Sequence, residues 1–221
     1  MTIVIFLISL SLFASDIPEI VRLSSINYEK ERNEIKNYKV VQDIYSETKS
    51  GNQVLVEKRK QIGYYISPDK FFFFVKEKSI NNVQIQIKTN EMEKTTKKEI
   101  EWLSQKILSK YEFKVLEDGV SHVHYSVLPK LIFPEANKGE IWINKENGRI
   151  QRILKEPIKM PNGFESYKTD IFFDFNVKFQ EPSFTRLQAT YYENNRKIET
   201  KVEVLFSGYQ FNVDLNKGVG Q

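Results

Sequence analysis

The feature that most constrains this fold is an alternation of apolar and polar residues with a period of two in the C-terminal half of the chain. One run sets apolar residues against polar ones, namely Ile171, Phe173, Phe175, Val177 and Phe179 against Asp174, Asn176 and Lys178. A second run sets Val202, Val204 and Phe206 against Lys201 and Glu203. Because successive residues of a strand point to opposite faces, the pattern predicts an antiparallel sheet with one face covered and the other in water.

Turn residues divide most of the remaining chain into similar segments. The predicted strands span residues 38–48, 53–66, 71–79, 83–89, 112–117, 120–128, 140–144, 150–156, 164–179, 184–193 and 197–208. The turns between them are predicted at Ser50-Gly51-Asn52, Pro68-Asp69, Asn81-Asn82, Asp118-Gly119, Asn147-Gly148, Asn162-Gly163 and Asn194-Asn195.

Two helices are predicted beside these strands. The first begins at Asp16 as N-cap, with Pro18 in the first turn and Glu19 at the capping-box position. Its apolar face is formed by Ile17, Val21, Tyr28 and Ile35.

The second helix is predicted over residues 92–110, beginning near Asn90 and Glu93. Its apolar residues recur at helical spacing and are Ile100, Leu103, Ile107, Leu108 and Tyr111. Charged residues on the other side indicate a face in water rather than a patch for a partner, and they are Lys94, Lys97, Lys98, Glu99 and Glu101.

These elements favour a single α+β domain, mainly antiparallel β, in which one large sheet curls around its helices. The sequence shows no fixed repeat and no low-complexity linker. We assign the domain to residues 16–214 and a flexible, Gly-containing tail to residues 215–221.

The N-terminus carries an apolar run over residues 3–13 that ends at the small residues Ala14 and Ser15. A membrane-spanning helix needs about 20 apolar residues, whereas the apolar region of a signal peptide needs about 7–15. Residues 1–15 are therefore predicted to be a removed signal peptide; an uncleaved anchor and a buried core helix are the alternatives. In a bacterium with two membranes, the mature chain would be periplasmic.

Composition excludes several classes of protein. The chain has no Cys, which excludes disulfide scaffolds, thiolate zinc sites and cysteine nucleophiles. Lys and Arg number 33 against 29 Asp and Glu, a net charge of +4 that is too evenly balanced for a nucleic-acid-binding face.

Signals for catalysis are weak. The common hydrolase, metalloprotease and nucleotide-binding motifs do not occur in the sequence. His122 and His124 share one face of a predicted strand, but no carboxylate motif completes a metal site with them. No metal, cofactor or catalytic residue is predicted.

The run of residues 71–75, FFFFV, obliges the sheet to be covered on both sides at that point. Either both sides are ordinary core, or one side lines an apolar cavity for a ligand. Each methylene of an acyl chain buried there would contribute about 0.8 kcal/mol, so no specific polar contact would be needed.

Two segments resemble the LolA-like outer-membrane lipoprotein carriers. Residues 63–72, GYYISPDKFF, are similar to a strand-turn-strand segment of these proteins. Residues 139–144 and 147–153 are similar to a later hairpin of the same lipoprotein-sorting superfamily, which includes RseB-type relatives. The order of signal peptide, helix, meander, helix and a long series of strands fits as well.

The resemblance implies an unclosed half-barrel of about eleven strands, with two helices covering its mouth and an apolar cavity for acyl chains. It also implies an arginine in the early sheet that bonds to the covering helix, and Arg59 is the arginine of the first two predicted strands. Ser67 stands before Pro68, where carriers often have a basic residue.

The chain is thus predicted to be a periplasmic binding or carrier protein for lipid or lipoprotein acyl chains, in outer-membrane lipoprotein sorting. The residues predicted to line its cavity are Tyr64, Ile66, Phe72, Phe74, Ile85, Trp142, Phe173 and Phe175. It is expected to act as a monomer with membrane-bound donor or acceptor proteins. A protein-interaction or sensor module on the same fold is the alternative, and an exported enzyme is a third.

Overall fold

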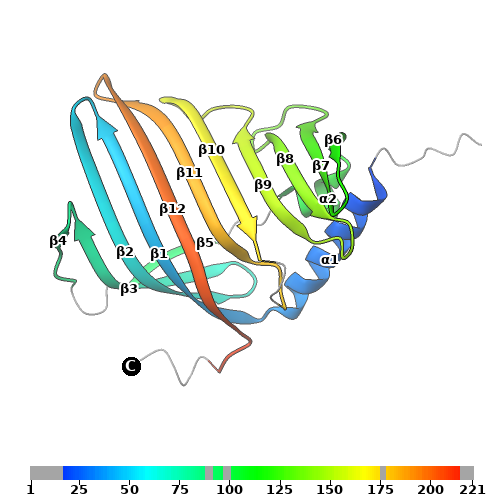
Figure 1. Ribbon diagram of the computed structural model, residues 1–221, viewed down its shortest axis with the longest axis horizontal. Helices are drawn as coiled ribbons and strands as arrows, with labels where there is room; N and C mark the ends of the chain where they lie inside the picture. The colour runs from blue at the N-terminus through cyan, green and yellow to red at the C-terminus, as the bar shows by residue number, and fades with distance from the viewer. Residues whose placement is uncertain (1–16, 88–91, 97–100, 175–177, 215–221) are drawn as a thin grey trace, which may run out of the picture.

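The computed structural model describes residues 17–87, 92–96, 101–174 and 178–214, and one antiparallel sheet of twelve strands dominates it (Figure 1). The strands are β1 (Asn37–Ser50), β2 (Gln53–Ile66), β3 (Lys70–Ile80), β4 (Val83–Gln84), β5 (Met92–Thr96), β6 (Tyr111–Asp118), β7 (His122–Pro129), β8 (Asn137–Asn144), β9 (Ile150–Pro157), β10 (Phe164–Phe173), β11 (Pro182–Glu193) and β12 (Arg196–Phe211). The helical elements are α1 (Glu19–Glu34), the 3₁₀-helix η1 (Glu101–Leu103) and α2 (Gln105–Leu108).

The strand order is β4-β3-β2-β1-β12-β11-β10-β9-β8-β7-β6, and β5 also pairs with β3. The last strand, β12, therefore lies between β1 and β11 and joins the N-terminal strands β1–β4 to the later strands β6–β11 in one sheet. In the described part of the chain no pairing joins β6 to β3, β4 or β5, so the sheet is unclosed. The predicted fold class, a mainly antiparallel and unclosed sheet with helices on one side, is confirmed.

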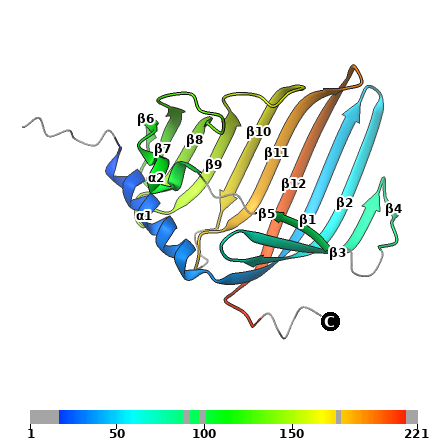
Figure 2. The same ribbon diagram turned by 180° about the vertical axis from the view of Figure 1, so that it is seen from behind.

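The sheet has two faces that differ in what covers them. The helices α1 and α2 lie on one face, which we call the inner face, and the opposite one is the outer face (Figure 2). Because the strand register is known, each residue can be assigned to a face by alternation. None of the helices in the described ranges combines the length and apolar composition needed to cross a membrane.

The first hydrophobic cluster lies between α1 and the inner face of β6–β10. Val21 and Tyr28 of α1 contact it, as predicted, together with the fully buried Trp102 and Leu103. The Ser25 hydroxyl donates a hydrogen bond to the carbonyl oxygen of Leu103 at 2.7 Å, which ties α1 to η1.

The N-terminus of α1 differs from the prediction. Its N-cap is Pro18, without a side-chain cap, and Glu19 bonds to Arg22 instead of completing a capping box. The predicted N-cap, Asp16, and the predicted signal peptide lie outside the described residues.

The second hydrophobic cluster lies on the inner face of β1, β2 and β3, next to Ile35 at the C-terminal end of α1. It contains Ile35, Tyr38, Val40, Tyr65, Phe71 and Phe179, with Phe73, Phe206, Tyr209 and Phe211 packed against it. Gly63 makes this packing possible, since a Cβ added there would lie 2.8 Å from Cζ of the Phe71 ring. Tyr38 and Tyr65 stack with their ring centroids 4.9 Å apart.

The predicted helix over residues 92–110 is wrong. Residues 92–96 form β5, which pairs antiparallel with residues 70–74 of β3, and the helical turns in the described part of this segment span residues 101–103 and 105–108. The edge of β3 offers unpaired backbone groups to a further strand, and Thr95 and Thr96 favour a strand over a helix. Pairing with β3 therefore prevails over the helical preference that the spacing of the apolar residues suggested. Leu103, Leu108 and Tyr111 are nevertheless buried, as predicted.

Most of the other predicted strands are present, with two shortened. The predicted strand 83–89 is reduced to β4, and residues 88–89 lie outside the described residues. The predicted strand 164–179 ends at Phe173, and Phe179 is buried in the second cluster. The turns at Asn81-Asn82 and Asn194-Asn195 have positive φ at both residues, as tight hairpin turns require.

Candidate ligand-binding surface

The residues predicted to line a cavity lie on both faces of the sheet. Tyr64, Ile66, Phe72, Phe74 and Trp142 are on the outer face, because their strand neighbours Tyr65, Phe71 and Ile141 point into the inner clusters. Phe173 is buried in the first inner cluster, and Ile85 is exposed just beyond β4. Phe175 lies outside the described residues. The structure therefore does not bring these residues around one space.

The FFFFV run is packed in the core on its inner side and half-buried on its outer side. Phe71 and Phe73 pack inward, 4.5 Å apart by ring centroids. On the outer face Phe74 packs edge-on against Tyr64, with centroids 5.6 Å apart, and Lys39 Nζ lies 6.0 Å from the Tyr64 ring centroid. Burial under these neighbours raises the pKa of Tyr64.

Trp142 on the outer face is held between two neighbouring strands. Its ring stacks on that of His124 of β7, with the ring centroids 4.0 Å apart. The guanidinium carbon of Arg152, on the opposite neighbouring strand β9, lies 4.6 Å from the Trp142 ring centroid. His124 Nε2 lies 2.9 Å from Glu140 Oε2. Among the described residues, no group of three or more potential ligands could hold a metal ion, so His122 and His124 belong to no such cluster.

Beyond both clusters, the inner face of the central strands carries an uncharged and half-buried surface. Its larger side chains are Ile44 of β1, Val202 and Val204 of β12, Leu187 of β11 and Tyr167 of β10, which we call the inner stripe. The hydroxyl groups of Ser46, Thr48, Thr185 and Thr200 lie among them. Neither hydrophobic cluster includes these side chains.

The inner stripe extends along β12 to a cavity. Phe206 is the next inner residue after Val204, and it lines a cavity of about 320 Å³ together with Tyr209 and Phe211. The Tyr209 hydroxyl donates a hydrogen bond to the carbonyl oxygen of Pro182 at 2.7 Å, and burial raises the pKa of Tyr209 well above its ordinary value. The cavity is at the lower end of the size range of small-molecule sites.

Glu181, which also lines this cavity, belongs to a buried polar network. Arg32 of α1 forms an ion pair with Glu181 at 2.8 Å and donates a hydrogen bond to the Tyr65 hydroxyl at 2.9 Å. The Tyr38 hydroxyl donates to Glu181 at 3.3 Å, and burial, reinforced by the Glu181 charge, raises the pKa of Tyr38 well above 10.

Sequence reasoning missed this network, although Arg32 follows Tyr28 by four residues and so shares the apolar face of the helix. The resemblance had suggested Arg59 for a bond between sheet and helix. Arg59 lies on β2, as expected, with its Nε 3.9 Å from Glu57 Oε1, whereas the ion pair with Glu181 is made by Arg32 of the helix.

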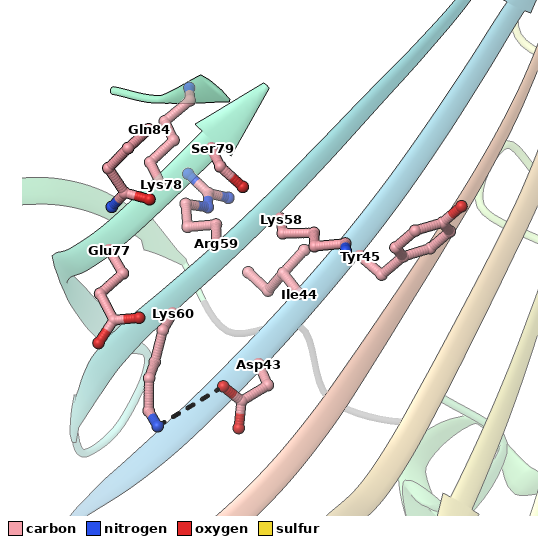
Figure 3. Close-up of a pocket in the computed structure, with 10 residues that line it drawn as sticks. All are labelled: Asp43, Ile44, Tyr45, Lys58, Arg59, Lys60, Glu77, Lys78, Ser79 and Gln84. Carbon is pink, nitrogen blue, oxygen red and sulfur yellow. Dashed lines mark ion pairs between the residues drawn. The ribbon is translucent and has the colours of Figure 1, made fainter. Parts of the chain in front are cut away.

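A separate polar pocket of about 440 Å³ lies over β1, β2 and β3 (Figure 3). Two outer-face rows line it, Asp43-Lys60-Glu77 and Tyr45-Lys58-Ser79, and the inner-face residues Ile44, Arg59 and Lys78 lie between them. Lys60 Nζ is 4.0 Å from Asp43, and carboxylates and amines of the two rows balance each other. Most side chains that line this pocket are charged or polar, and Ile44 is the residue that it shares with the inner stripe.

Comparison with known proteins gives similarity of structure only. No family model matches the sequence, and no curated protein matches it. A LolA superfamily protein from Nitrosomonas europaea matches with a TM-score of 0.43 and 8% identity, over 90% of this chain and 94% of that one.

A DUF1329 family protein from Desulfovibrio piger matches with a TM-score of 0.43 and 10% identity, over 91% of this chain and 95% of that one. A putative outer membrane lipoprotein-sorting protein domain from Vibrio parahaemolyticus gives the same TM-score and identity, over 89% and 96% of the two chains. These names include the superfamily that the sequence resembles, but a similarity of this extent identifies neither a ligand nor a partner.

Proposed function

We propose that the inner stripe binds the acyl chain of a lipid or of a lipid-modified protein, and that the chain is an exported, non-catalytic binding or carrier protein. The observation that carries the proposal is the contrast between the two faces of β12. Over residues 197–204, the outer residues Lys197, Glu199, Lys201 and Glu203 are charged, whereas the inner residues Ile198, Thr200, Val202 and Val204 are uncharged. An apolar, half-buried surface outside the core fits a hydrocarbon ligand.

The energetics favour a long apolar chain over a small polar ligand. Each methylene removed from water contributes about 0.8 kcal/mol, so ten methylenes on the inner stripe would contribute on the order of 8 kcal/mol before ordering costs. The half-buried hydroxyls of the surface need no charged partner. Export to the periplasm through residues 1–15 and a role in lipoprotein sorting are parts of the same proposal.

Native mass spectrometry of the purified protein and displacement of a fluorescent fatty acid test the proposal. Val204 and its neighbour Leu205 form a matched pair, because they are adjacent on β12 and point to opposite faces. Val204→Glu is expected to abolish fatty-acid binding, whereas Leu205→Glu, at a side chain that is 52% exposed, is expected to leave it unchanged.

Thermal unfolding of both variants checks that they fold. If Val204→Glu fails to fold, the nearly isosteric Val202→Thr is used in its place and is expected to weaken binding. Absence of bound lipid together with no protection of the fluorescent acid, or equal binding by the Val204 and Leu205 variants, would overturn the proposal.

The edge of the sheet favours a second candidate, a module that binds a peptide of another protein. β6 is an end strand of the described sheet, and Val115 and Leu116 on it are about half exposed. An extended segment could pair with such an edge. Stoichiometric capture of one soluble periplasmic protein in lipid-free form would favour this function over lipid binding.

A further inference from the structure

The charges of the inner face lie at the borders of the inner stripe rather than within it. In the described parts of β1, β10, β11 and β12 the inner positions are uncharged, except for Glu193 and Arg196, which face each other at the β11–β12 turn. The outer positions of the same strands carry many charges. The inner face is thus a neutral band about four strands wide.

The borders of this band are cationic. On one side Arg59 of β2 stands opposite Ile44, and Lys78 of β3 stands opposite Arg59. On the other side Lys155 of β9 stands opposite Thr169. Glu57 accompanies the first pair, with its carboxylate 3.3 Å from Lys78 Nζ. Among the described side chains assigned to the inner face at these borders, Arg59, Lys78 and Lys155 are cationic and Glu57 is anionic.

Partial burial makes these charges more effective. The side chains of Arg59 and Lys78 are 22% and 32% exposed, whereas that of Lys60, the next residue on the outer face, is 49% exposed. A charge that is partly removed from water interacts more strongly with an opposite charge than a fully hydrated one does. An anion at this border would thus be favoured over an uncharged group.

We propose that the acyl ligand carries an anionic headgroup, a carboxylate or a phosphate, and that Arg59 binds this headgroup with Lys78 beside it. The inference rests on the proposed function. A guanidinium suits both groups because its planar N–H donors match two oxygens at once.

The positions of the residues agree with this arrangement. Val204 lies two strands from Arg59, about 10 Å along the sheet, so a headgroup at Arg59 places the first methylenes on Ile44 and Val204. Lys155 is five strands away, about 24 Å, which is too far for the same headgroup to contact.

The test compares dodecanoate with its uncharged methyl ester, each below its micelle concentration, by displacement of a fluorescent apolar probe. Dodecanoate is expected to bind more tightly, and Arg59→Gln is expected to reduce that advantage on the order of tenfold without changing the affinity for the ester. Dodecyl phosphate is expected to behave like dodecanoate. Inorganic phosphate alone is expected not to displace the probe, which distinguishes a lipid headgroup from a free anion.

Two further variants test whether the headgroup binds on the inner face and whether the effect depends on the charge beside Arg59. Lys60→Gln removes the same charge from the same strand on the outer face and is expected to change nothing. Glu57→Gln removes the carboxylate beside the site and is expected to raise the affinity for dodecanoate several-fold.

Each outcome bears on one of the two proposals. Equal affinity for acid and ester, or equal losses in the Arg59 and Lys60 variants, would overturn the headgroup assignment while acyl binding stands. Displacement of the probe by inorganic phosphate alone would overturn it as well. Failure of both acid and ester to bind would overturn the proposed function itself.

Discussion

Replacing Arg32 by Met is expected to destabilise the fold by about 3–5 kcal/mol, because it leaves a buried carboxylate without its cation. The side chains of Arg32 and Glu181 are only 8% and 2% exposed, and their ion pair is 2.8 Å long. The Tyr38 hydroxyl also donates a hydrogen bond to Glu181, at 3.3 Å. A neutral hydroxyl donor does not replace the cation that compensates for burial of the carboxylate charge.

A double-variant cycle separates this cause from lost packing. Glu181→Gln alone leaves the Arg32 guanidinium buried with the Tyr65 hydroxyl, and it is also expected to destabilise the fold. The combination of Arg32→Met and Glu181→Gln removes both charges, so it is expected to cost less than the sum of the two by about 2–3 kcal/mol. Urea unfolding followed by circular dichroism measures all three free energies.

The same helix supplies two internal controls. The pair of Glu31 and Arg149 is half-buried, with side chains 20% and 16% exposed, so breaking it is expected to have a smaller effect. The pair of Glu19 and Arg22 is exposed, and Arg22→Gln is expected to change stability too little to measure. A loss below about 1 kcal/mol for Arg32→Met, or equal losses at all three pairs, would refute the reasoning.

Two other properties follow from the same structure. The pKa values of Tyr38 and Tyr209 are raised in the folded state, so the unfolded chain loses these protons at lower pH and the free energy of unfolding is expected to fall as pH rises above about 10. Tyr209→Phe should reduce this loss in unfolding curves at high pH. An unchanged dependence of the unfolding free energy on pH would contradict the assignment. Gly139→Ala is expected to destabilise the fold by at least about 2 kcal/mol, because a Cβ there would lie 1.9 Å from the Leu154 carbonyl oxygen. Gly51→Ala, with nothing within 4 Å of the added Cβ, should cost about 1 kcal/mol for its positive φ alone. Equal melting temperatures of the two variants would contradict this prediction.

Much of the fold could be predicted because its strands alternate and its turns are chemically distinct. The predicted segment 53–66 matches β2 to the residue, and the predicted segment 184–193 shares its end with β11. Pairs such as Asn194-Asn195 are among the few residues that adopt positive φ without glycine, so they mark hairpins clearly. Local sequence alone settles these elements.

The segment around residue 100 could not be predicted in this way. Its apolar residues have helical spacing, but the formation of β5 depends on the edge of β3, which is more than 15 residues earlier in the chain. Helix propensity is a weak preference that a nearby unpaired strand can override. The burial of Leu103 and Leu108 was predicted from the spacing of the apolar residues, whereas the backbone conformation of the segment was not.

The candidate site was harder to predict because a run without alternation does not reveal its faces. In the FFFFV segment every residue is apolar, and only the register with β2 shows that Phe71 points inward and Phe72 outward. In β12 the alternation is clear, and Val202 and Val204 had been recognised as one apolar face. Their position outside the core depends on where α1 ends, which the strand itself does not encode.

The lengths of the elements explain why an apolar surface remains on the inner face. β1 and β12 contain 14 and 16 residues and are about 46 and 53 Å long, whereas the 16 residues of α1 span about 24 Å. A helix is about 10 Å wide, while the eleven strands that lie side by side in the sheet extend over about 48 Å. The described helices therefore cannot cover the face that the alternation makes apolar. The inner stripe lies on the part of this face that α1 does not reach, which is why the proposed function depends on it.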